Sequence, residues 1–560
     1  MKRFRWQLII LGLALIAIAM LLLSQQTAPT QNSELQPVSG GIYSEALIGS
    51  LGRLNPVLDY TNQVDRDVDR LLFSGLIKFD AYGLPQPDLA ESWGISADGK
   101  TYNFSLRSNA IWHDGSPVTS DDVIFTVDAL RSDASPYPAD IKEMWKQIQV
   151  NPLDAKTLQF HLPEPFAPFL DYLTFGLLPK HLLGGTGVEG MLNAPFNSQP
   201  VGSGPFQFKQ FQSENGVVTG VELSAFGQYY NGRPYLDEVV FHYYPDGTSA
   251  MAAYRAKEVL GISRIDEANL AEALHQPGLN LYTGRLPSLN IILFNLNDEK
   301  LPFFKDAQIR KALLMALNRQ RMVDNLRNGQ AIIADGVIFP GTWAYYQGTE
   351  RINYDPDKAL EVIKQAGYTF PAEGEPVRSK DEVPFSFELV YADEAGFAEL
   401  AQQIVDSWSK LGIQVKLKAV PFDQLLNQYL ETHTFQAALV ELNFGRSPDP
   451  DPYPFWDQAM INEGQNYSQW DDRAASEYLE KARVTSDWGE RAKLYGNFQV
   501  RFMMEMPALP LFYPVYSYAV DDTIQNVAMG PLFDPADRFL NISSWYLRVR
   551  RLQNSPTETP

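Results

Sequence analysis

The chain has 560 residues, of which 45% are hydrophobic and 12% aromatic, so it can bury a large core and form roughly two to four domains. Its formal net charge of −21 argues against a nucleic-acid partner, because phosphate binding requires a basic surface. The absence of cysteine excludes disulfide bonds, thiol catalysis, thiolate metal sites and a lipid-modified N-terminal cysteine.

Residues 1–24 have the pattern of a membrane-targeting segment. Lys2, Arg3 and Arg5 precede an uncharged run from Leu8 to Leu23. This run is long for the apolar part of a signal peptide and slightly short for a membrane span of about 20 residues. No clear A-x-A cleavage site follows it, so we expect an anchor rather than a cleaved signal peptide. The basic flank keeps the N-terminus inside and sends the rest of the chain out.

The composition then changes to that of a linker. Residues 25–40 are rich in Gln, Thr, Ser and Pro, which predicts a flexible tether. A strand at Gly41–Tyr43 begins the folded body, and a loop follows from Ile48 to Pro56. Apolar positions recur at helical spacing between Asp65 and Phe79, which predicts a helix there.

The stretch from Leu89 to Thr126 predicts one packed unit of strand, turn and capped helix. Apolar Tyr102, Phe104 and Leu106 alternate with polar residues, as in a half-buried strand. The dipeptides Asp98-Gly99 and Asp114-Gly115 predict turns on either side of it. Thr119, followed three residues later by Asp122, has the form of a capping box for a helix from Val123 to Leu130.

This stretch also resembles a known family, the extracellular solute-binding proteins, family 5. The shared elements, in order and with fixed spacing, read LAESW, DGKTYNFSLR and WHDGSPVTSDDVIF, with FSGL before them and PVGSGP after them. The resemblance spans roughly residues 39–548. It implies an α/β, two-lobed, periplasmic-binding-protein-like fold of type II, in the large peptide-binder class. An extra subdomain at about residues 65–198 is expected within lobe I.

The remaining elements fit such an arrangement. Strands are predicted at 206–211, 217–223 and 238–244, and the nearly continuous apolar run Leu289–Leu296 predicts a fully buried strand at the entry to the second lobe. Asp306 can cap a helix that continues toward Gly329. A strand at 385–390, a helix ended by Gly412 and a strand at 413–417 form the clearest βαβ pattern, and a further strand runs from 435 to 442. We therefore expect lobe I at 41–285, lobe II at 286–511, a return to lobe I at 512–550 and a tail at 551–560.

A proline-rich loop after the strand at 435–442 is the main candidate for ligand contact. Prolines stand at every second position from Pro448 to Pro454, which stiffens the segment as an extended wall at the end of a sheet strand. The resemblance implies that peptide-binding relatives use an aspartate here for the ligand's ammonium group. In this chain Arg446 or Pro448 stands near that position, and Arg446 suits an anionic group; a solvent-facing arginine is the alternative. The other candidates in the loop are Asp449, Asp451, Tyr453 and Trp456.

Two further segments carry aromatic residues. The resemblance places the first at the ligand and the second after the proline-rich loop. Trp343 and Tyr345 follow Phe339-Pro340-Gly341, and Asn466 and Tyr467 lie in the segment GQNYSQW. Aromatic rings give broad apolar contact and leave polar donors for orientation, so they suit peptides and sugars equally. Core packing is the alternative for each ring. In the loop after the first strand, Ser50 is a candidate beside Gly49 and Arg53, with a solvated turn as the alternative.

The expected function is capture of an extracellular solute, most simply a peptide, and its delivery to the permease of an ABC importer. Oligosaccharides are the nearest alternative, and a membrane-tethered sensor or a hydrolase would be a different class. No catalytic constellation stands out, because Ser203 lies in G-S-G-P rather than in a nucleophile elbow. The six histidines have no metal-ligand spacing, and no cofactor is expected. We expect a monomer outside the cytoplasm, in the periplasm or on the outer face of the membrane.

Overall fold

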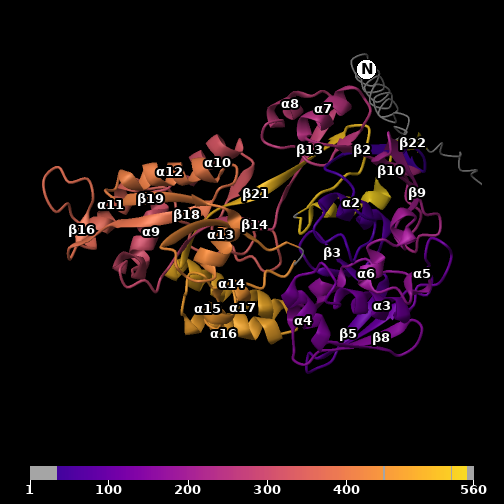
Figure 1. The fold of residues 1–560 in the computed structure, drawn as a ribbon, viewed down its shortest axis with the longest axis horizontal. Helices are drawn as coiled ribbons and strands as arrows, with labels where there is room; N and C mark the ends of the chain where they lie inside the picture. The colour runs from indigo at the N-terminus through magenta and orange to yellow at the C-terminus, as the bar shows by residue number, and fades with distance from the viewer. Residues whose placement is uncertain (1–34, 446–447, 531, 552–560) are drawn as a thin grey trace, which may run out of the picture.

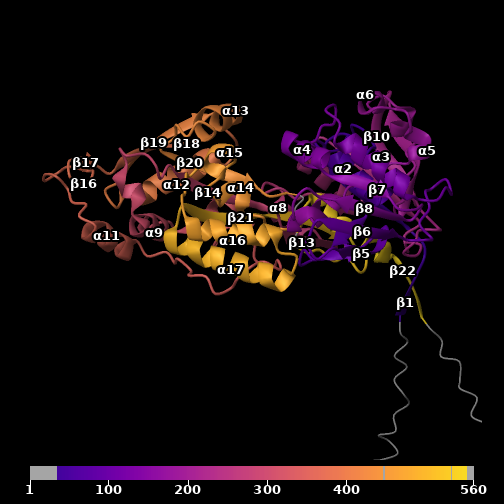
Figure 2. The same cartoon turned by 90° about the horizontal axis from the view of Figure 1, so that it is seen from below.

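The computed structural model describes residues 35–445, 448–530 and 532–551, and these residues form two lobes side by side (Figure 1). The turned view in Figure 2 shows the same division between lobe I, which holds the N-terminal half, and lobe II. The α/β fold with two lobes is therefore confirmed. Within the described ranges, no helix has the length and apolar character needed to cross a membrane. The predicted membrane segment at 1–24 lies outside these ranges.

Lobe I is built on a mixed sheet. Strand β2 (Ile42–Ile48) pairs in parallel with β11 (Glu238–Tyr244) and β12 (Gly261–Ile262), and the antiparallel strands β10 (Val217–Ala225) and β9 (Phe206–Glu214) extend the sheet beyond β11. Apolar residues of the sheet pack against α2 and the C-terminal segment, with Trp545 fully buried among them. The other elements of this lobe are β1 (Leu35–Val38), α2 (Gln63–Leu72), α7 (Gly247–Arg255), α8 (Leu270–His275), β13 (Leu279–Arg285), the 3-10 helices η5 (Pro535–Phe539) and η6 (Ile542–Ser544), and β22 (Arg548–Arg551).

The extra subdomain of lobe I has its own small sheet and core. Four antiparallel strands, in the order β5-β6-β8-β7, carry Tyr102, Phe104 and Phe160 into a cluster that also buries Trp112 and Trp145. The elements are β3 (Ile77–Phe79), β4 (Pro85–Pro87), β5 (Ala90–Ile95), β6 (Thr101–Leu106), α3 (Ser120–Leu130), α4 (Ala139–Gln147), β7 (Gln149–Pro152), β8 (Thr157–His161), η1 (Ala167–Leu173), α5 (Lys180–Leu183), α6 (Val188–Met191) and η2 (Pro195–Ser198).

Lobe II is organised around the buried strand β14 (Ser288–Phe294), all of whose residues are buried. β20 pairs antiparallel with β14, and β18 pairs in parallel with both β19 and β20. The further elements are η3 (Pro302–Lys305), α9 (Ala307–Met315), α10 (Arg319–Arg327), β15 (Ala331–Ile333), α11 (Pro356–Gln365), β16 (Ser379–Lys380), β17 (Val383–Pro384), β18 (Ser386–Ala392), α12 (Phe397–Ser409), β19 (Gln414–Val420), α13 (Phe422–Gln424), the π-helix η4 (Leu425–Leu430), β20 (Ala437–Asn443), α14 (Tyr453–Trp456), α15 (Met460–Glu463), α16 (Arg473–Val484) and α17 (Trp488–Glu505).

One long strand, β21 (Ala508–Asp521), connects the lobes. Its first half pairs with β14 in lobe II, and its second half pairs with β13 and β12 in lobe I. The chain also crosses between the lobes at residues 286–287, between β13 and β14. Two adjacent crossings therefore join the lobes, and the predicted boundary at residue 511 falls inside β21.

Several local signals give the predicted elements. The capping box of Thr119 and Asp122 opens α3, and the Asp306 side chain accepts a hydrogen bond from the backbone N–H of Gln308 at the start of α9. The βαβ pattern is confirmed, because β18 and β19 are parallel neighbours with α12 between them. Gly412 follows α12 in the left-handed region with φ at 78°.

Three expectations differ from the structure. The helix predicted between Asp65 and Phe79 ends at Leu72, and Ile77–Phe79 form strand β3 instead. The single helix predicted from Asp306 toward Gly329 is two helices, because the Asn318 side chain caps α10 and so opens a new helix there. The linker predicted to extend to residue 40 is shorter, because β1 pairs antiparallel with β22. This pairing joins the two ends of the described chain, Leu35 opposite Arg551.

Candidate ligand-binding site

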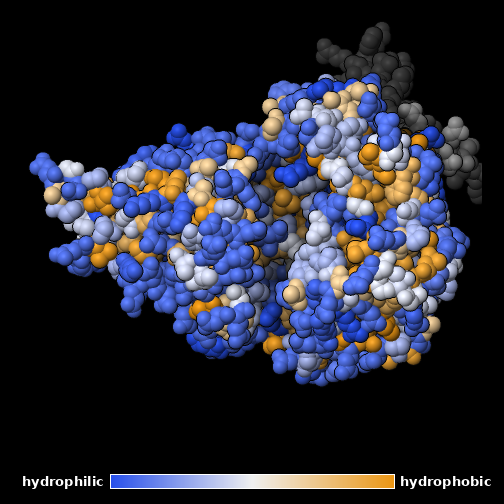
Figure 3. Space-filling view, viewed as in Figure 1, coloured by the Kyte–Doolittle hydropathy of each residue, from blue (hydrophilic) through white to orange (hydrophobic). Residues whose placement is uncertain are grey.

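A pocket lies where lobe I, its subdomain and the edge of lobe II meet. Its volume is about 470 Å³, within the range of roughly 300–1,000 Å³ that is typical of small-molecule sites. The space-filling view shows the molecule hollowed between the lobes, with hydrophobic residues inside the hollow (Figure 3). Lobe II contributes Gly445 and Pro448, which flank the two residues after β20 that lie outside the described ranges. The pocket wall therefore depends on how the lobes sit together.

Helix α2 supplies one charged wall of the pocket. The Asn62 side chain accepts a hydrogen bond from the backbone N–H of Val64 and so starts the helix. Arg66, Asp69 and Arg70 then follow at spacings of three and four residues, which places them on one face. That face lines the pocket, and the apolar residues on the rest of the helix pack into the core of lobe I.

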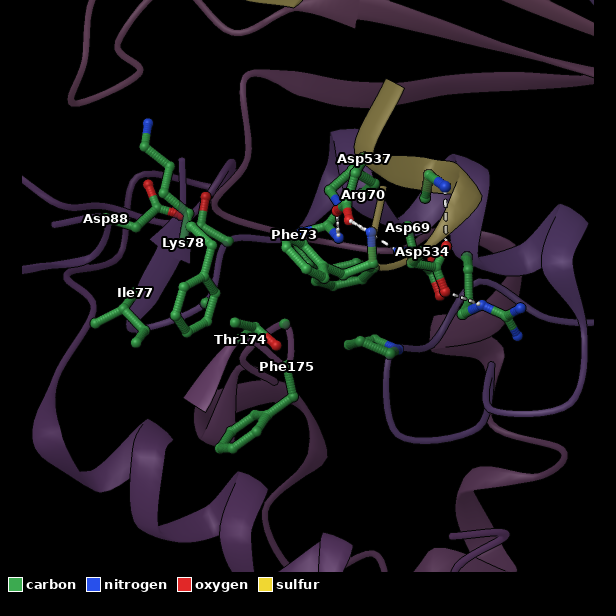
Figure 4. A pocket seen from close by; sticks show the side chains of 18 of the residues that line it. Asp69, Arg70, Phe73, Ile77, Lys78, Asp88, Thr174, Phe175, Asp534 and Asp537 are labelled. Atoms are coloured by element: carbon green, nitrogen blue, oxygen red, sulfur yellow. Dashed lines mark hydrogen bonds and ion pairs between the residues drawn. The ribbon is translucent and has the colours of Figure 1, made fainter. Parts of the chain in front are cut away.

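The two arginines of α2 are paired with the C-terminal segment. Arg66 Nε lies 2.9 Å from Asp534 Oδ2, and Arg70 forms an ion pair with Asp537. Burial raises the pKa of Asp537, against the effect of the nearby Arg70 guanidinium. These pairs hold η5 against α2, so both guanidinium charges are already neutralised within the wall (Figure 4).

Among the residues that the structure describes, no side chain donates a hydrogen bond to the Asp69 carboxylate. The residue is 3% exposed and lines the pocket (Figure 4). Burial raises its pKa well above the ordinary value, Asp59 and Asp65 raise it further, and the backbone N–H of Asn55 lowers it. A buried carboxylate without a side-chain donor is unfavourable, so this group is available to a proton or to a cation.

A second acidic group lies on the opposite side of the pocket. Asp88 accepts a hydrogen bond of 2.6 Å from the Tyr230 hydroxyl, and Figure 4 shows it beside Lys78. Burial raises the pKa of Asp88, and the charge of Lys78 opposes that shift. This carboxylate is therefore satisfied within the wall.

Aromatic rings form much of the remaining wall. Tyr60 and Tyr137 lie with ring centroids 4.8 Å apart. Phe73 lies between the two charged sides, and Phe175 lies below it (Figure 4). The other rings that line the pocket are Phe79, Trp145, Tyr172, Tyr229, Phe533 and Phe539. A site with apolar walls and a few polar groups binds organic ligands by shape and orients them by charge.

The structure places the predicted ligand residues elsewhere. None of those that it describes lines this pocket. Asp449 is buried in an ion pair with Arg491 and accepts a hydrogen bond of 2.9 Å from the Tyr495 hydroxyl. Asp451 pairs with Arg483 at 3.0 Å, and the same guanidinium lies over the Tyr453 ring. The loop is therefore tied to α16 and α17 of its own lobe.

The predicted aromatic and amide residues also serve packing inside lobe II. Trp456 and Tyr467 are buried in its core, and the buried Asn466 side chain donates hydrogen bonds to the backbone carbonyls of Asp457 and Trp470. Trp343 lies beside the Arg491 guanidinium, and Tyr345 packs on the same core. Ser50 and its neighbours Gly49 and Arg53 are exposed, and Arg446 lies outside the described residues. Binding roles for these residues remain predictions.

The lobes touch beside the pocket. The backbone N–H of Asp449 donates a hydrogen bond of 2.6 Å to Asp171 Oδ2 in the subdomain. The backbone N–H of Trp343 donates one of 3.0 Å to the carbonyl of Tyr82. The proline-rich loop thus reaches lobe I through its backbone. Its predicted place at the interlobe gap fits these contacts, although its described side chains turn into lobe II.

The pocket residues of α2 were missed from the sequence. The segment from Asp65 to Arg70 reads DRDVDR and mixes acidic and basic residues, a pattern typical of a solvated helix face. Its charges are instead largely buried, with Asp65, Asp67 and Asp69 all within the fold. The useful signal was the high density of aspartate in a helix that also carries a strong apolar stripe.

The class of protein follows from this geometry and from comparison with known sequences. Residues 85–495 match the family described as bacterial extracellular solute-binding proteins, family 5. The match spans more than half of the chain, so the protein belongs to this family of solute-binding proteins.

Individual relatives agree with this assignment. The chain is 27% identical to the oligopeptide-binding protein AppA of Bacillus subtilis, over 98% of this chain and 100% of AppA. It is 27% identical to the dipeptide-binding protein of Escherichia coli, over 88% of this chain and 94% of that protein. The structure of B. subtilis AppA in complex with a nonapeptide superimposes with a TM-score of 0.66 at 26% identity, covering 92% of this chain and 100% of AppA. HbpA2 of Haemophilus parasuis shares the fold, with a TM-score of 0.78 at 23% identity, over 89% and 99% of the chains.

Proposed function

We propose that this protein captures short peptides outside the cytoplasm and delivers them to the permease of an ABC importer. The observation that carries the proposal is the pocket of about 470 Å³ whose walls come from both lobes. Family membership and the peptide-binding relatives support it. The volume favours short peptides, because it lies toward the lower half of the range of roughly 300–1,000 Å³ for small-molecule sites.

Closure and opening of the lobes control access to the pocket. The two crossings, residues 286–287 and β21, lie side by side and supply the hinge. Rotation about them moves Gly445 and Pro448 relative to α2 and so changes the pocket wall. The ligand is held by non-covalent contacts and released unchanged, so the protein acts as a binder and not as an enzyme.

The proline-rich loop is the part of lobe II that meets the ligand. In the sequence, Arg446 comes between the pocket residues Gly445 and Pro448, and a guanidinium there would pair with the carboxylate of a peptide. Asp449, Asp451 and Tyr453 act indirectly, because their contacts with Arg483 and Arg491 orient the loop. Residues 1–24 keep the protein at the membrane as a monomer beside its permease.

Native mass spectrometry of the purified protein tests this function. We expect bound peptides of a few residues to co-purify, and isothermal titration calorimetry to give saturable binding of synthetic di- and tripeptides. The peptide masses should be unchanged after incubation. Binding of oligosaccharides without any binding of peptides would refute the proposal, and so would hydrolysis of the peptides.

A further inference from the structure

Asp69 is an acidic group with no structural task that the fold reveals. Its residue is 3% exposed, it lines the pocket, and within the described ranges no side chain donates a hydrogen bond to either carboxylate oxygen. A residue that served only to fill space would be apolar or paired, because an unpaired buried carboxylate is destabilising. The Asp69 carboxylate is therefore suited to a ligand that supplies a hydrogen-bond donor.

The charges around the pocket define which ligand fits. Six carboxylates line it, Asp59, Asp69, Asp88, Asp171, Asp534 and Asp537, against the cationic side chains Arg66, Arg70 and Lys78. Arg66 and Arg70 are bound to Asp534 and Asp537, and Lys78 lies beside Asp88 on the far side (Figure 4). The wall at Asp69 therefore has a local excess of negative charge, with Asp59 and Asp65 as its neighbours.

The aromatic rings of the pocket favour the same kind of ligand. Tyr60, Phe73, Tyr137 and Phe175 line the pocket together with Asp69. The faces of such rings attract cations within about 6 Å of the ring centroid. An acidic group at the wall and aromatic rings around it form a site for an organic cation with an apolar body.

We infer that the pocket contains a cation subsite at Asp69, where the carboxylate accepts hydrogen bonds from an ammonium or guanidinium group of the bound ligand. This inference rests on the proposed function, and it narrows the ligands to peptides or small amines that carry a positive charge. Helix α2 of lobe I holds the positively charged group of the ligand, and the apolar part of the ligand lies against the aromatic rings.

A matched pair of small probes tests the subsite without any peptide. 2-Phenylethylammonium and 2-phenylethanol have the same apolar body and differ in charge, and saturation-transfer NMR with the full-length protein measures the binding of each. We expect the ammonium to bind more tightly than the alcohol by roughly tenfold or more, as a charge-assisted hydrogen bond predicts. Equal binding of the two probes, or tighter binding of the alcohol, would overturn the subsite.

Variants assign that preference to Asp69. Asp69→Asn keeps the shape of the side chain and removes its charge, so the preference for the ammonium should fall to about that of the alcohol. Asp324→Asn, on α10 of lobe II and outside the pocket lining, is the matched control and should leave the preference intact. An unchanged preference in Asp69→Asn would overturn the inference, and the comparison of probes on the unaltered protein still decides it if that variant does not fold.

Peptide binding separates this inference from the proposed function. Dipeptides that bind equally well with a free and with an acetylated N-terminus, and with and without a basic side chain, would leave the proposed function standing and remove the subsite. Amine probes that bind through Asp69 while no peptide binds would leave the subsite standing and remove peptide transport. If neither the probes nor any peptide binds, both the cation subsite and the proposed function are refuted.

Discussion

At the scale of single residues, Asp69 combines a binding role with a loss of stability. Its pKa is raised in the folded protein by burial and then by Asp59 and Asp65, whereas in the unfolded chain it returns to about 3.9. The titratable groups that face it are these two carboxylates and the Tyr243 hydroxyl on β11. At pH values between these two pKa values, the folded protein binds a proton at Asp69 that the unfolded chain does not bind. The free energy of unfolding therefore falls as the pH rises through the folded-state pKa.

We therefore expect Asp69→Asn to stabilise the ligand-free protein at pH 8. The gain should be about 1–3 kcal/mol at that pH, the penalty of an unsatisfied buried group, and it should shrink toward pH 4. Urea unfolding of both proteins at the two pH values measures the difference. A variant that is less stable than the unaltered protein at pH 8, or a difference independent of pH, contradicts this assignment of Asp69.

Trp456 gives the opposite case, a candidate ligand residue that the structure uses for packing. Its ring centroid lies 4.8 Å from that of Phe502 and 6.5 Å from that of Trp470. Trp456→Ala should lower the free energy of unfolding by about 3–5 kcal/mol. Tyr354→Ala, at a residue 52% exposed, should change it by no more than about 0.5 kcal/mol. Lost ligand affinity at unchanged stability would instead assign Trp456 to the binding site.

At the scale of elements, the loop after β20 is fixed by two ion pairs of unequal burial. The Arg491 guanidinium, buried with Asp449, lies 5.0 Å from the Trp343 ring centroid and 5.1 Å from that of Trp488. Arg483, which pairs with Asp451, has 30% of its side chain exposed. Removal of Arg491 leaves a fully buried carboxylate uncompensated, whereas the pair of Arg483 and Asp451, with side chains 30% and 14% exposed, is partly screened by water.

Arg491→Met should therefore destabilise the protein by about 3–5 kcal/mol, and Arg483→Met by no more than about 1 kcal/mol. The double variant Asp449→Leu with Arg491→Met should recover part of the loss, because no unpaired charge remains. Guanidinium unfolding measures all of these variants. Equal losses for the two arginine variants would show that the buried pair does not hold the loop.

The elements also show which parts of the fold the sequence predicts. The strand β14, the cap of α3 and the parallel pair β18–β19 were predicted, because each depends on periodicity or on neighbouring residues. The pairing of β1 with β22 was not predicted, since it joins residues at opposite ends of the chain. The pocket was missed for the same reason. The role of Asp69 depends on its tertiary neighbours, none of which donates a side-chain hydrogen bond to its carboxylate within the described residues.

At the scale of the whole molecule, two crossings join the lobes, and the proposed function makes relative motion of the lobes the basis of ligand capture. The chain contains no cysteine, so two introduced cysteines can be labelled selectively. Val217 on β10, 64% exposed, and Phe422 at the start of α13, 54% exposed, provide one site in each lobe. Nitroxide labels at these sites report the distance between the lobes by double electron–electron resonance.

We expect a bound peptide to narrow the distance distribution and to shift its mean, because the closed state is selected from an ensemble of lobe positions. A matched pair of labels within lobe I, at Val217 and Leu182, should not respond. An identical distribution for both pairs with and without peptide would show that the lobes do not move on binding.

Crystallography of the purified protein with a short cationic peptide establishes where the ligand lies. The account predicts peptide density between α2 and the segment flanked by Gly445 and Pro448, with the positively charged group within hydrogen-bonding distance of the Asp69 carboxylate. Peptide density outside the pocket between the lobes, or a pocket that stays empty at saturating peptide, would contradict it.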